Sequence, residues 1–216
     1  MSLDVRMLTV GPLQENAYLV RRPGADRAVI VDPGDEADRL LGVVEELGVA
    51  LDAILLTHTH FDHVGAVAAV ARATGAPVYV PELEREVLAN INDHVRMPGF
   101  GPFESWEAEH TVAGGERLQL AGLDLDVVFT PGHSPGHVTY AVEDSQALFS
   151  GDVLFQGSVG RTDLPGGDWP TLAASIRGLL ERYPEETRVH PGHMGLTTLG
   201  RERATNPFLA DLPTRQ

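Results

Sequence analysis

The segment LLTHTHFDHVG, residues 55–65, joins an apolar run typical of a buried strand to three histidines and an aspartate. Side chains two residues apart on an extended segment point the same way, so His58 and His60 can converge on one point. A bend further along lets Asp62 and His63 face a neighbouring point. Burying these polar groups without partners would destabilise the folded protein. A divalent cation removes this free-energy cost, because it accepts the imidazole lone pairs and neutralises the carboxylate. The segment therefore predicts a metal site at a strand end.

Two further segments end strands in a Pro-Gly-His corner: DVVFTPGHSPG at 126–136 and ETRVHPGHMG at 186–195. Proline and glycine fix a tight exit from each strand, so His133 and His193 are delivered at strand ends and not within a core. Asp152 closes another strand-like run, ALFSGD. We expect these three residues to complete the ligand set.

Seven ligands are enough for two metal ions. We expect His58, His60 and His133 to bind one ion and Asp62, His63 and His193 to bind the other, with Asp152 bridging. Two divalent ions, two carboxylates and one hydroxide leave a net charge of about +1, which suits a developing oxyanion. A water bridging the two ions can ionise near pH 7, so the metal-bound hydroxide is the expected nucleophile. Asp62 is a candidate proton shuttle.

Other polar residues near these segments have supporting roles in this interpretation. Asp32 ends a predicted strand and can orient a ligand imidazole, although a plain Asp-Pro-Gly turn explains it almost as well. Thr57, next to His58, is a second candidate for such support.

Four histidines lie outside the ligand set. His137 and His190 are near ligands in sequence, and we expect them to support the site or to belong to the core. His94 and His110, in or beside an irregular segment, are expected at the surface or on the substrate side.

The composition excludes several classes of partner. The 216 residues carry a net charge of −15, whereas proteins that bind nucleic acid or anionic membranes concentrate positive charge. There is no cysteine, so any metal must be held by nitrogen and oxygen ligands, and a reducing compartment is favoured. No signal peptide pattern and no apolar run of about 20 residues occurs. We expect a cytoplasmic protein without nucleic-acid or membrane partners.

Strand and helix patterns alternate along the whole chain, with no long Pro/Gly/Ser linker, which predicts one domain over residues 1–216 of the α/β class. A segment rich in Pro, Gly and aromatic residues, 91–109, is expected to be a loop that faces a ligand. The expected strands are 4–10, 17–22, 27–32, 52–57, 77–80, 116–120, 123–130, 137–142, 147–151 and 187–190, and the expected helices are 35–47, 64–74, 82–90 and 170–182.

The motif THTHFDH at 57–63, followed by His133, Asp152 and His193, resembles the signature of the metallo-β-lactamase superfamily. This resemblance covers most of the chain and implies an αββα sandwich with the metals between the sheet edges. Within the superfamily the chain looks like the short bacterial hydroxyacylglutathione hydrolases (glyoxalase II), on the segments GPLQENAYLV, VDPGD, PGHSPGH, GSVGRTDLPGGD and TNPFL.

The closer resemblance implies a thioesterase that cleaves S-D-lactoylglutathione or a related small acyl-thioester, using two divalent ions, with zinc first and iron or manganese as alternatives. The chain departs from the long form of glyoxalase II, whose C-terminal helical extension carries basic residues that hold glutathione. Here the chain stops soon after TNPFL and contains no lysine. Arg161 can take one anion contact, or equally fix its own loop.

Three other functions fit the same residues. A mononuclear-iron persulfide dioxygenase would use His58, His133 and Asp152 as a facial triad. A lactonase or other ester hydrolase needs the same oxyanion geometry as a thioesterase. A metal-binding protein without catalysis is the third. The oligomeric state is not predicted.

Overall fold

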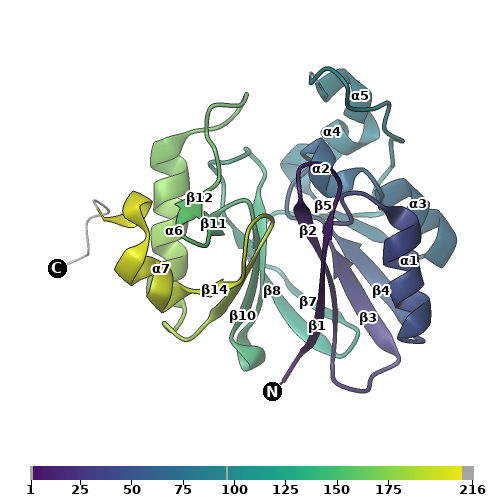
Figure 1. Ribbon diagram of the computed structural model, residues 1–216, viewed down its shortest axis with the longest axis horizontal. Coiled ribbons are helices and arrows are strands. Elements are labelled where there is room, and N and C mark those ends of the chain that lie inside the picture. The colour runs from purple at the N-terminus through teal and green to yellow at the C-terminus, as the bar shows by residue number, and fades with distance from the viewer. Residues whose placement is uncertain (1, 96, 211–216) are drawn as a thin grey trace.

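The computed structural model describes residues 2–95 and 97–210. Two six-stranded sheets pack face to face, and helices cover the outer face of each sheet (Figure 1). The layers therefore follow the order helix, sheet, sheet, helix. This confirms the predicted α/β class and the αββα sandwich.

The first sheet contains the N-terminal strands in the order β1-β2-β3-β4-β5-β6. A hairpin of β1 and β2 begins the sheet, with Val10 paired to Glu15 beside the turn. From β3 onward neighbouring strands run parallel, so their carboxyl ends lie at the same edge. The strands are β1 (Asp4–Val10), β2 (Glu15–Arg21), β3 (Arg27–Val31), β4 (Ala50–Leu55), β5 (Val78–Pro81) and β6 (His110–Val112).

The second sheet has the order β14-β13-β10-β9-β8-β7 and is mostly antiparallel, except that β10 and β13 run parallel. A two-stranded ribbon of β11 (Leu154–Phe155) and β12 (Ser158–Val159) follows β10. The strands of the sheet are β7 (Arg117–Leu120), β8 (Leu123–Phe129), β9 (Val138–Val142), β10 (Ala147–Gly151), β13 (Arg188–Pro191) and β14 (Thr197–Thr198).

The helices divide between the two outer layers (Figure 1). On the side of the first sheet, α1 (Ala37–Glu46) and α3 (Val67–Thr74) lie along the strands, and α2 (Phe61–Val64), α4 (Arg85–Ala89) and α5 (Ile91–His94) lie toward the upper strand ends. The second sheet is covered by α6 (Trp169–Arg182) and α7 (Leu199–Thr205). Short 3₁₀ turns are η1 (Glu82–Glu84), η2 (Glu143–Ser145) and η3 (Pro207–Leu209). Asp168 caps α6 by accepting a hydrogen bond from the amide of Thr171 at 2.9 Å, and proline stands in the first turn as predicted.

Three apolar clusters hold the layers together. One lies between the first sheet and its helices, and contains Leu40 of α1 and Val67 of α3. The second lies between the two sheets, where Tyr18, Tyr140 and Phe149 are almost completely buried. The third joins the second sheet to α6 and α7. Because the middle cluster contains strands from both halves of the chain, the two sheets are fixed relative to each other.

The structure corrects the predicted helix at 64–74. It is divided into α2, which begins within the histidine motif, and α3. The break occurs because the amide of Ala66 donates to the carbonyl oxygen of Pro33 at 3.0 Å and not to a helical partner. The helical turn in α2 directs the side chains of Asp62 and His63.

Several other helices and strands were missed by the sequence patterns, among them α5, β6, β11, β12, β14 and α7. The expected loop at 91–109 begins with the short helix α5 and is otherwise irregular. Strand β14 and helix α7 lie beyond the last predicted strand. Thr198 caps α7 by accepting from the amide of Arg201 at 3.2 Å, a signal that is easily overlooked in a short polar segment.

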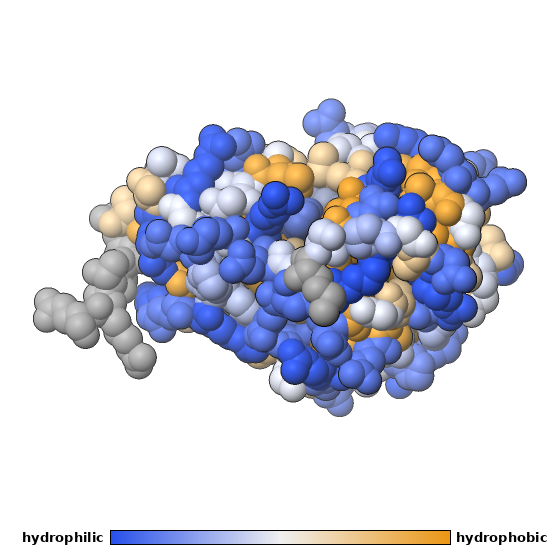
Figure 2. Space-filling model, turned by 90° about the horizontal axis from the view of Figure 1, so that it is seen from below, coloured by the Kyte–Doolittle hydropathy of each residue, from blue (hydrophilic) through white to orange (hydrophobic). Residues whose placement is uncertain are grey.

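The surface is consistent with the acidic composition. Hydrophilic residues dominate the face seen from below, and apolar residues form small patches between them (Figure 2). In the described part of the chain, no helix combines the length and apolar character needed to cross a membrane.

Candidate metal centre

Strand ends from both sheets meet at one edge of the sandwich. The histidine motif follows β4, and Asp152 and His193 follow the parallel strands β10 and β13. The sheets are tied together here, because the amide of Val138 in β9 donates to the carbonyl oxygen of Thr57 at 2.9 Å. Polar loops from two separate regions of the sequence therefore share one site.

The first group contains His58, His60 and His133. Nδ1 of His60 lies 3.1 Å from Nε2 of His58 and 2.8 Å from Nε2 of His133. His58 and His133 are buried, and His60 is partly buried. Three imidazole nitrogens thus point at one small volume and can hold a metal ion.

The second group contains Asp62, His63 and His193, with Nε2 of His193 3.3 Å from Oδ2 of Asp62. Asp152 lies between the groups. Its Oδ1 is 3.4 Å from Nε2 of His63, and its Oδ2 is 3.4 Å from Nε2 of His133 and 3.6 Å from Nε2 of His193. The structure thus brings together all seven side chains predicted as ligands.

The donor set fits a divalent cation. Thr57 Oγ1 donates its proton to Asp32 at 2.6 Å, so it accepts from Nδ1 of His58 at 3.0 Å and leaves the Nε2 lone pair pointing inward. Nδ1 of His133 donates to a backbone carbonyl oxygen at 2.7 Å, so its Nε2 lone pair also points inward. The Nε2 lone pairs of His58 and His133 both face Nδ1 of His60. A proton on this nitrogen can form a hydrogen bond with only one of the two. A cation among the three nitrogens satisfies all of them.

Buried polar atoms without partners indicate that the second group also fits a cation. Among the described residues, Nε2 of His63 and Oδ1 of Asp152 have no hydrogen-bond partner although both are buried. Unsatisfied buried polar atoms are rare in native proteins, and an ion between them is an accepted explanation. The residues present therefore fit a two-ion centre with nitrogen and oxygen ligands.

The electrostatics differ between the two histidine groups. At His63 and His193, burial alone would lower the pKa, but the neighbouring carboxylates raise it. Burial and the neighbouring His133 lower the pKa of His60 to about 4, and burial also lowers the pKa of His58. Burial alone would raise the pKa of Asp152, but the adjacent His63 holds it well below the usual range. Asp62 also has a lowered pKa, because the hydrogen bond with His193 outweighs burial. An ionised Asp62 is a proton acceptor and not a general acid, which limits its predicted role as a shuttle.

Asp32 and Thr57 form hydrogen bonds with histidines of the predicted ligand set. Oδ2 of Asp32 lies 3.1 Å from Nδ1 of His63, and Oδ1 accepts from the amide of Thr57 at 2.7 Å. Asp32 adopts a left-handed conformation, with φ of 47°, which aspartate tolerates better than most residues. The Asp-Pro-Gly segment thus forms both a turn and a support for the histidines.

Close packing around the Pro-Gly-His corner that bears His193 requires glycine at position 192. A Cβ atom at Gly192 would lie 2.3 Å from Oδ1 of Asp152 and 2.6 Å from Cε1 of His63. Only glycine lets the backbone that carries His193 pass so close to the other ligands.

The remaining histidines take different places. His137 is buried, and its Nε2 accepts from the amide of Asp152 at 3.1 Å, so it supports a predicted ligand. His190 is a core residue that stacks on Phe149 with ring centroids 4.7 Å apart. His94 and His110 are exposed and lie outside both groups, as expected.

Arg161 contacts the centre only through its backbone. Its carbonyl oxygen accepts from His133, whereas its guanidinium forms two hydrogen bonds of 2.7 Å with Asp163 at the surface. The structure thus shows the loop-fixing role, and the anion contact stays a prediction.

Glu84 has a structural role that the sequence did not reveal. This buried carboxylate accepts four hydrogen bonds: from the amide (2.6 Å) and hydroxyl of Thr59, from the hydroxyl of Ser134 and from the amide of Gly136 (3.0 Å). It therefore fastens the loop of His60 to the loop that bears His133. The segment around Glu84 is rich in charge and resembles an exposed helix, so no sequence signal distinguishes it.

Glu15 is a second acidic residue that was missed. It is buried at the start of β2, with Oε1 3.8 Å from Nδ1 of His63, and burial raises its pKa well above the usual value. A charged residue at the start of an otherwise buried strand was the available signal.

Comparisons with known proteins agree with this geometry. The family model described as "Metallo-beta-lactamase superfamily" matches residues 10–193. The probable metallo-hydrolase YqgX of Bacillus subtilis (strain 168) is 42% identical over 209 residues, which cover 94% of this chain and 96% of the relative. The hydroxyacylglutathione hydrolase GloC of Haemophilus influenzae is 34% identical, over 96% of this chain and 98% of the relative.

Solved structures give the same result. The crystal structure of BLEG-1 B3 metallo-beta-lactamase has a TM-score of 0.90 at 42% identity, and covers 96% of this chain and 100% of that one. TTHA1623 in a di-iron-bound form has a TM-score of 0.84 at 47% identity, with coverage of 95% and 100%. ETHE1 from Myxococcus xanthus is more distant, with a TM-score of 0.76 at 29% identity, and the match covers 94% of this chain and 83% of that one. From the fold, the convergent histidines and aspartates and these matches, we conclude that the chain belongs to the metallo-β-lactamase superfamily and has a centre for divalent metal ions.

Proposed function

We propose that the protein is a dinuclear metal-dependent hydrolase of small acyl-thioesters, similar to glyoxalase II. The observation that carries this proposal is the position of Asp152 between the two histidine groups, within 3.4 Å of His133 in the first and of His63 in the second. His58, His60 and His133 would hold one divalent ion, Asp62, His63 and His193 the other, and Asp152 both. Zinc is our first assignment, with iron or manganese as alternatives.

The bound ions would lower the pKa of a shared water and polarise the substrate carbonyl. The protein supplies the orientation of the ligands. Asp32 and Thr57 fix the imidazoles of His63 and His58, and the carbonyl oxygen of Arg161 fixes that of His133. Such supports hold each ring with its lone pair toward the centre and raise its basicity.

Thioesters suit this site better than amides. A thiolate leaving group has a pKa near 8.5, so it departs without a strong general acid, whereas an amine does not. Asp62 and Asp152 both have lowered pKa values and are ionised at neutral pH. Neither carboxylate therefore carries a proton at the start of the reaction, whereas amide cleavage requires a proton donor for the leaving amine.

Similarity supports the proposal at the level of reaction class. GloC, 34% identical over nearly the full length, is named a hydroxyacylglutathione hydrolase. TTHA1623 has been crystallised in a di-iron-bound form, which supports a two-ion centre and keeps iron among the metals to test.

The test is thioester hydrolysis by protein loaded separately with zinc, iron or manganese. We expect S-D-lactoylglutathione or a simple acyl-thioester to be cleaved, and chelation followed by metal addition to abolish and restore the activity. A lactone and a β-lactam serve as comparison substrates and should be cleaved more slowly. Turnover that survives complete removal of metal would refute the proposal.

A mononuclear-iron persulfide dioxygenase is the second candidate, favoured by the 29% identity with ETHE1. That reaction needs one iron and consumes oxygen. One iron per chain, with oxygen uptake on a persulfide and no thioester hydrolysis, would select it.

A further inference from the structure

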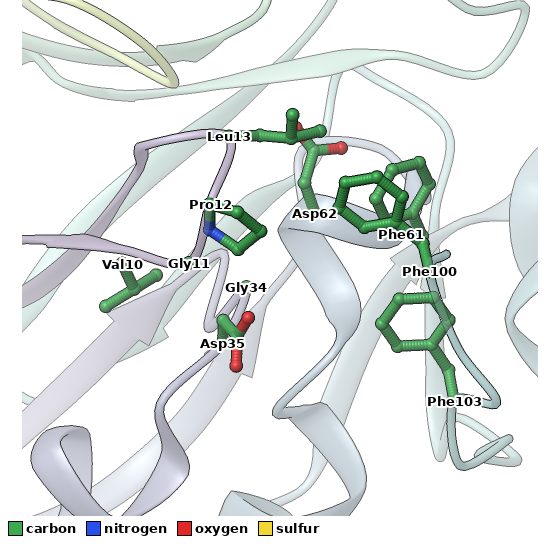
Figure 3. A pocket seen from close by; sticks show the side chains of 10 residues that line it. All are labelled: Val10, Gly11, Pro12, Leu13, Gly34, Asp35, Phe61, Asp62, Phe100 and Phe103. Atoms are coloured by element: carbon green, nitrogen blue, oxygen red, sulfur yellow. The ribbon is translucent and has the colours of Figure 1, made fainter. Parts of the chain in front are cut away.

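A cleft adjoins the candidate metal centre at Asp62 (Figure 3). The cleft is open to solvent, and its unfilled space is about 250 Å³ when the solvent at its mouth is included. Ten described residues line it: Val10, Gly11, Pro12, Leu13, Gly34, Asp35, Phe61, Asp62, Phe100 and Phe103. Because Asp62 belongs to both the cleft and the second ligand group, a substrate held at the metals can extend directly into the cleft.

One wall of the cleft is aromatic. The ring centroid of Phe61 lies 5.0 Å from that of Phe100 and 5.5 Å from that of Phe103. Phe61 belongs to the histidine motif itself, and the other two come from the irregular segment that follows α5. Asn92 fastens this segment, since its side chain exchanges hydrogen bonds of 2.7 and 2.8 Å with the backbone of Phe103. These hydrogen bonds therefore hold the aromatic wall in place.

The opposite wall is the β1–β2 turn. Leu13, at its tip, is 37% exposed and lies beside Asp62, facing the aromatic rings across the cleft (Figure 3). The turn is fixed from below, because the amide of Gly11 donates to Oε1 of Glu36 at 2.9 Å. Two fixed apolar walls leave a slot that suits a flat or branched apolar group.

The described lining of the cleft contains no cationic side chain. Among the described residues that line it, Asp35 and Asp62 are acidic and none is cationic. Arg39 is not part of the lining, and its guanidinium binds the carboxylate of Glu36 at 3.0 Å and the carbonyl oxygen of Thr9 at 2.8 Å. With Asp62 engaged as a metal ligand, Asp35 is the remaining charged side chain of this described lining, so a glutathione carboxylate would find no cationic partner here, whereas an uncharged apolar group would be favoured by burial.

We propose that this cleft binds the acyl group, and that the preferred substrates are thioesters of uncharged apolar acids, aromatic or branched, more than of hydroxy acids such as lactate. This inference rests on the proposed thioesterase function, and it specifies the substrate class. The thiol carrier then extends away from the cleft.

The kinetic test compares two acyl groups on one neutral thiol, N-acetylcysteamine. We expect the metal-loaded enzyme to hydrolyse the phenylacetyl thioester with a kcat/KM at least about 10-fold above that for the D-lactoyl thioester. Phe100→Ala should reduce this ratio by about 10-fold at unchanged metal content. Phe208→Ala, which removes an exposed aromatic ring outside the cleft, should leave the ratio unchanged.

Equal values for both thioesters, or an unchanged ratio in Phe100→Ala, would overturn the acyl-group assignment while leaving thioesterase activity intact. Hydrolysis of neither substrate would instead refute the proposed function.

A binding measurement tests whether the cleft takes an apolar aromatic ligand, independently of catalysis. The neutral ketone 4-fluorophenylacetone, added to the metal-loaded protein, should show a broadened ¹⁹F NMR line with the wild type and Phe208→Ala, and a sharper one with Phe100→Ala. A line that stays sharp with the wild type would overturn the inference whatever the enzyme assay gives.

Discussion

The carboxylate of Asp32 connects directly to His63, with Oδ2 3.1 Å from Nδ1, and the same oxygen accepts the hydroxyl proton of Thr57 at 2.6 Å. Thr57 in turn orients His58. One buried carboxylate thus fixes an imidazole in each of the two ligand groups, which couples the two halves of the centre.

Replacing Asp32 should therefore weaken both metal positions. Supporting carboxylates of this kind contribute about 10- to 100-fold in metal affinity or activity. We expect Asp32→Asn to lower zinc affinity within this range, measured by competition with a chromophoric chelator. Asp38→Asn, an exposed position in α1, is the matched control. Wild-type affinity in Asp32→Asn would contradict the support role.

Glu84 should matter for stability and for the first metal position. In the wild type, each carboxylate oxygen of Glu84 accepts two hydrogen bonds. In Glu84→Gln one oxygen is replaced by an NH₂ group, which cannot accept them, so we expect a loss of about 2–4 kcal/mol in the free energy of unfolding. Metal affinity should fall as well, because the loops of His60 and His133 lose their connection. Glu82→Gln, two residues away and exposed, controls for the change of charge. Urea unfolding curves that coincide for the two variants would exclude the connection.

His190 gives a prediction for pH. Burial lowers its pKa from 6.5 to about 4 in the folded protein, whereas the unfolded chain keeps the ordinary value. The unfolded state therefore binds the proton more readily between these values, and stability is lost as the pH falls from about 6.5 toward 4.

The His190→Asn variant isolates this effect, because asparagine does not titrate and can still donate to the carbonyl oxygen of Leu148. With metal-free proteins, we expect the stability difference between wild type and variant to be about 2 kcal/mol smaller at pH 5 than at pH 8. A difference independent of pH would mean that His190 is not neutral in the core.

Arg161 tests whether the carrier of the substrate is anionic. Its guanidinium is half exposed and paired with Asp163, an exposed carboxylate that a ligand carboxylate can replace. We expect Arg161→Ala to raise KM for S-D-lactoylglutathione about threefold to tenfold, with KM for a neutral carrier unchanged. Equal KM values for wild type and variant on both substrates would leave only the loop-fixing role.

The fold and the grouping of the candidate ligands could be predicted from the sequence, because each depends on signals within short segments. Strand ends followed by Pro-Gly-His or by His-x-His indicate where polar groups leave the core, and parallel strands bring those ends to one edge. Asp32 was recognisable for the same reason, as a carboxylate at a strand end.

Contacts between distant segments could not be predicted in this way. Glu84 acts through Thr59 and Ser134, which are 25 and 50 positions away in the sequence. The break between α2 and α3 depends on the carbonyl oxygen of Pro33, and the aromatic wall depends on how the segment after α5 folds back onto Phe61. No periodicity or turn signal encodes such contacts.

The most direct test of the two-ion centre is the metal content per chain, measured by elemental mass spectrometry after zinc loading and removal of unbound metal. We predict two ions per chain for the wild type and for His94→Ala, and one or fewer for His193→Ala. Two ions retained by His193→Ala, or a single ion in the wild type, would contradict the account.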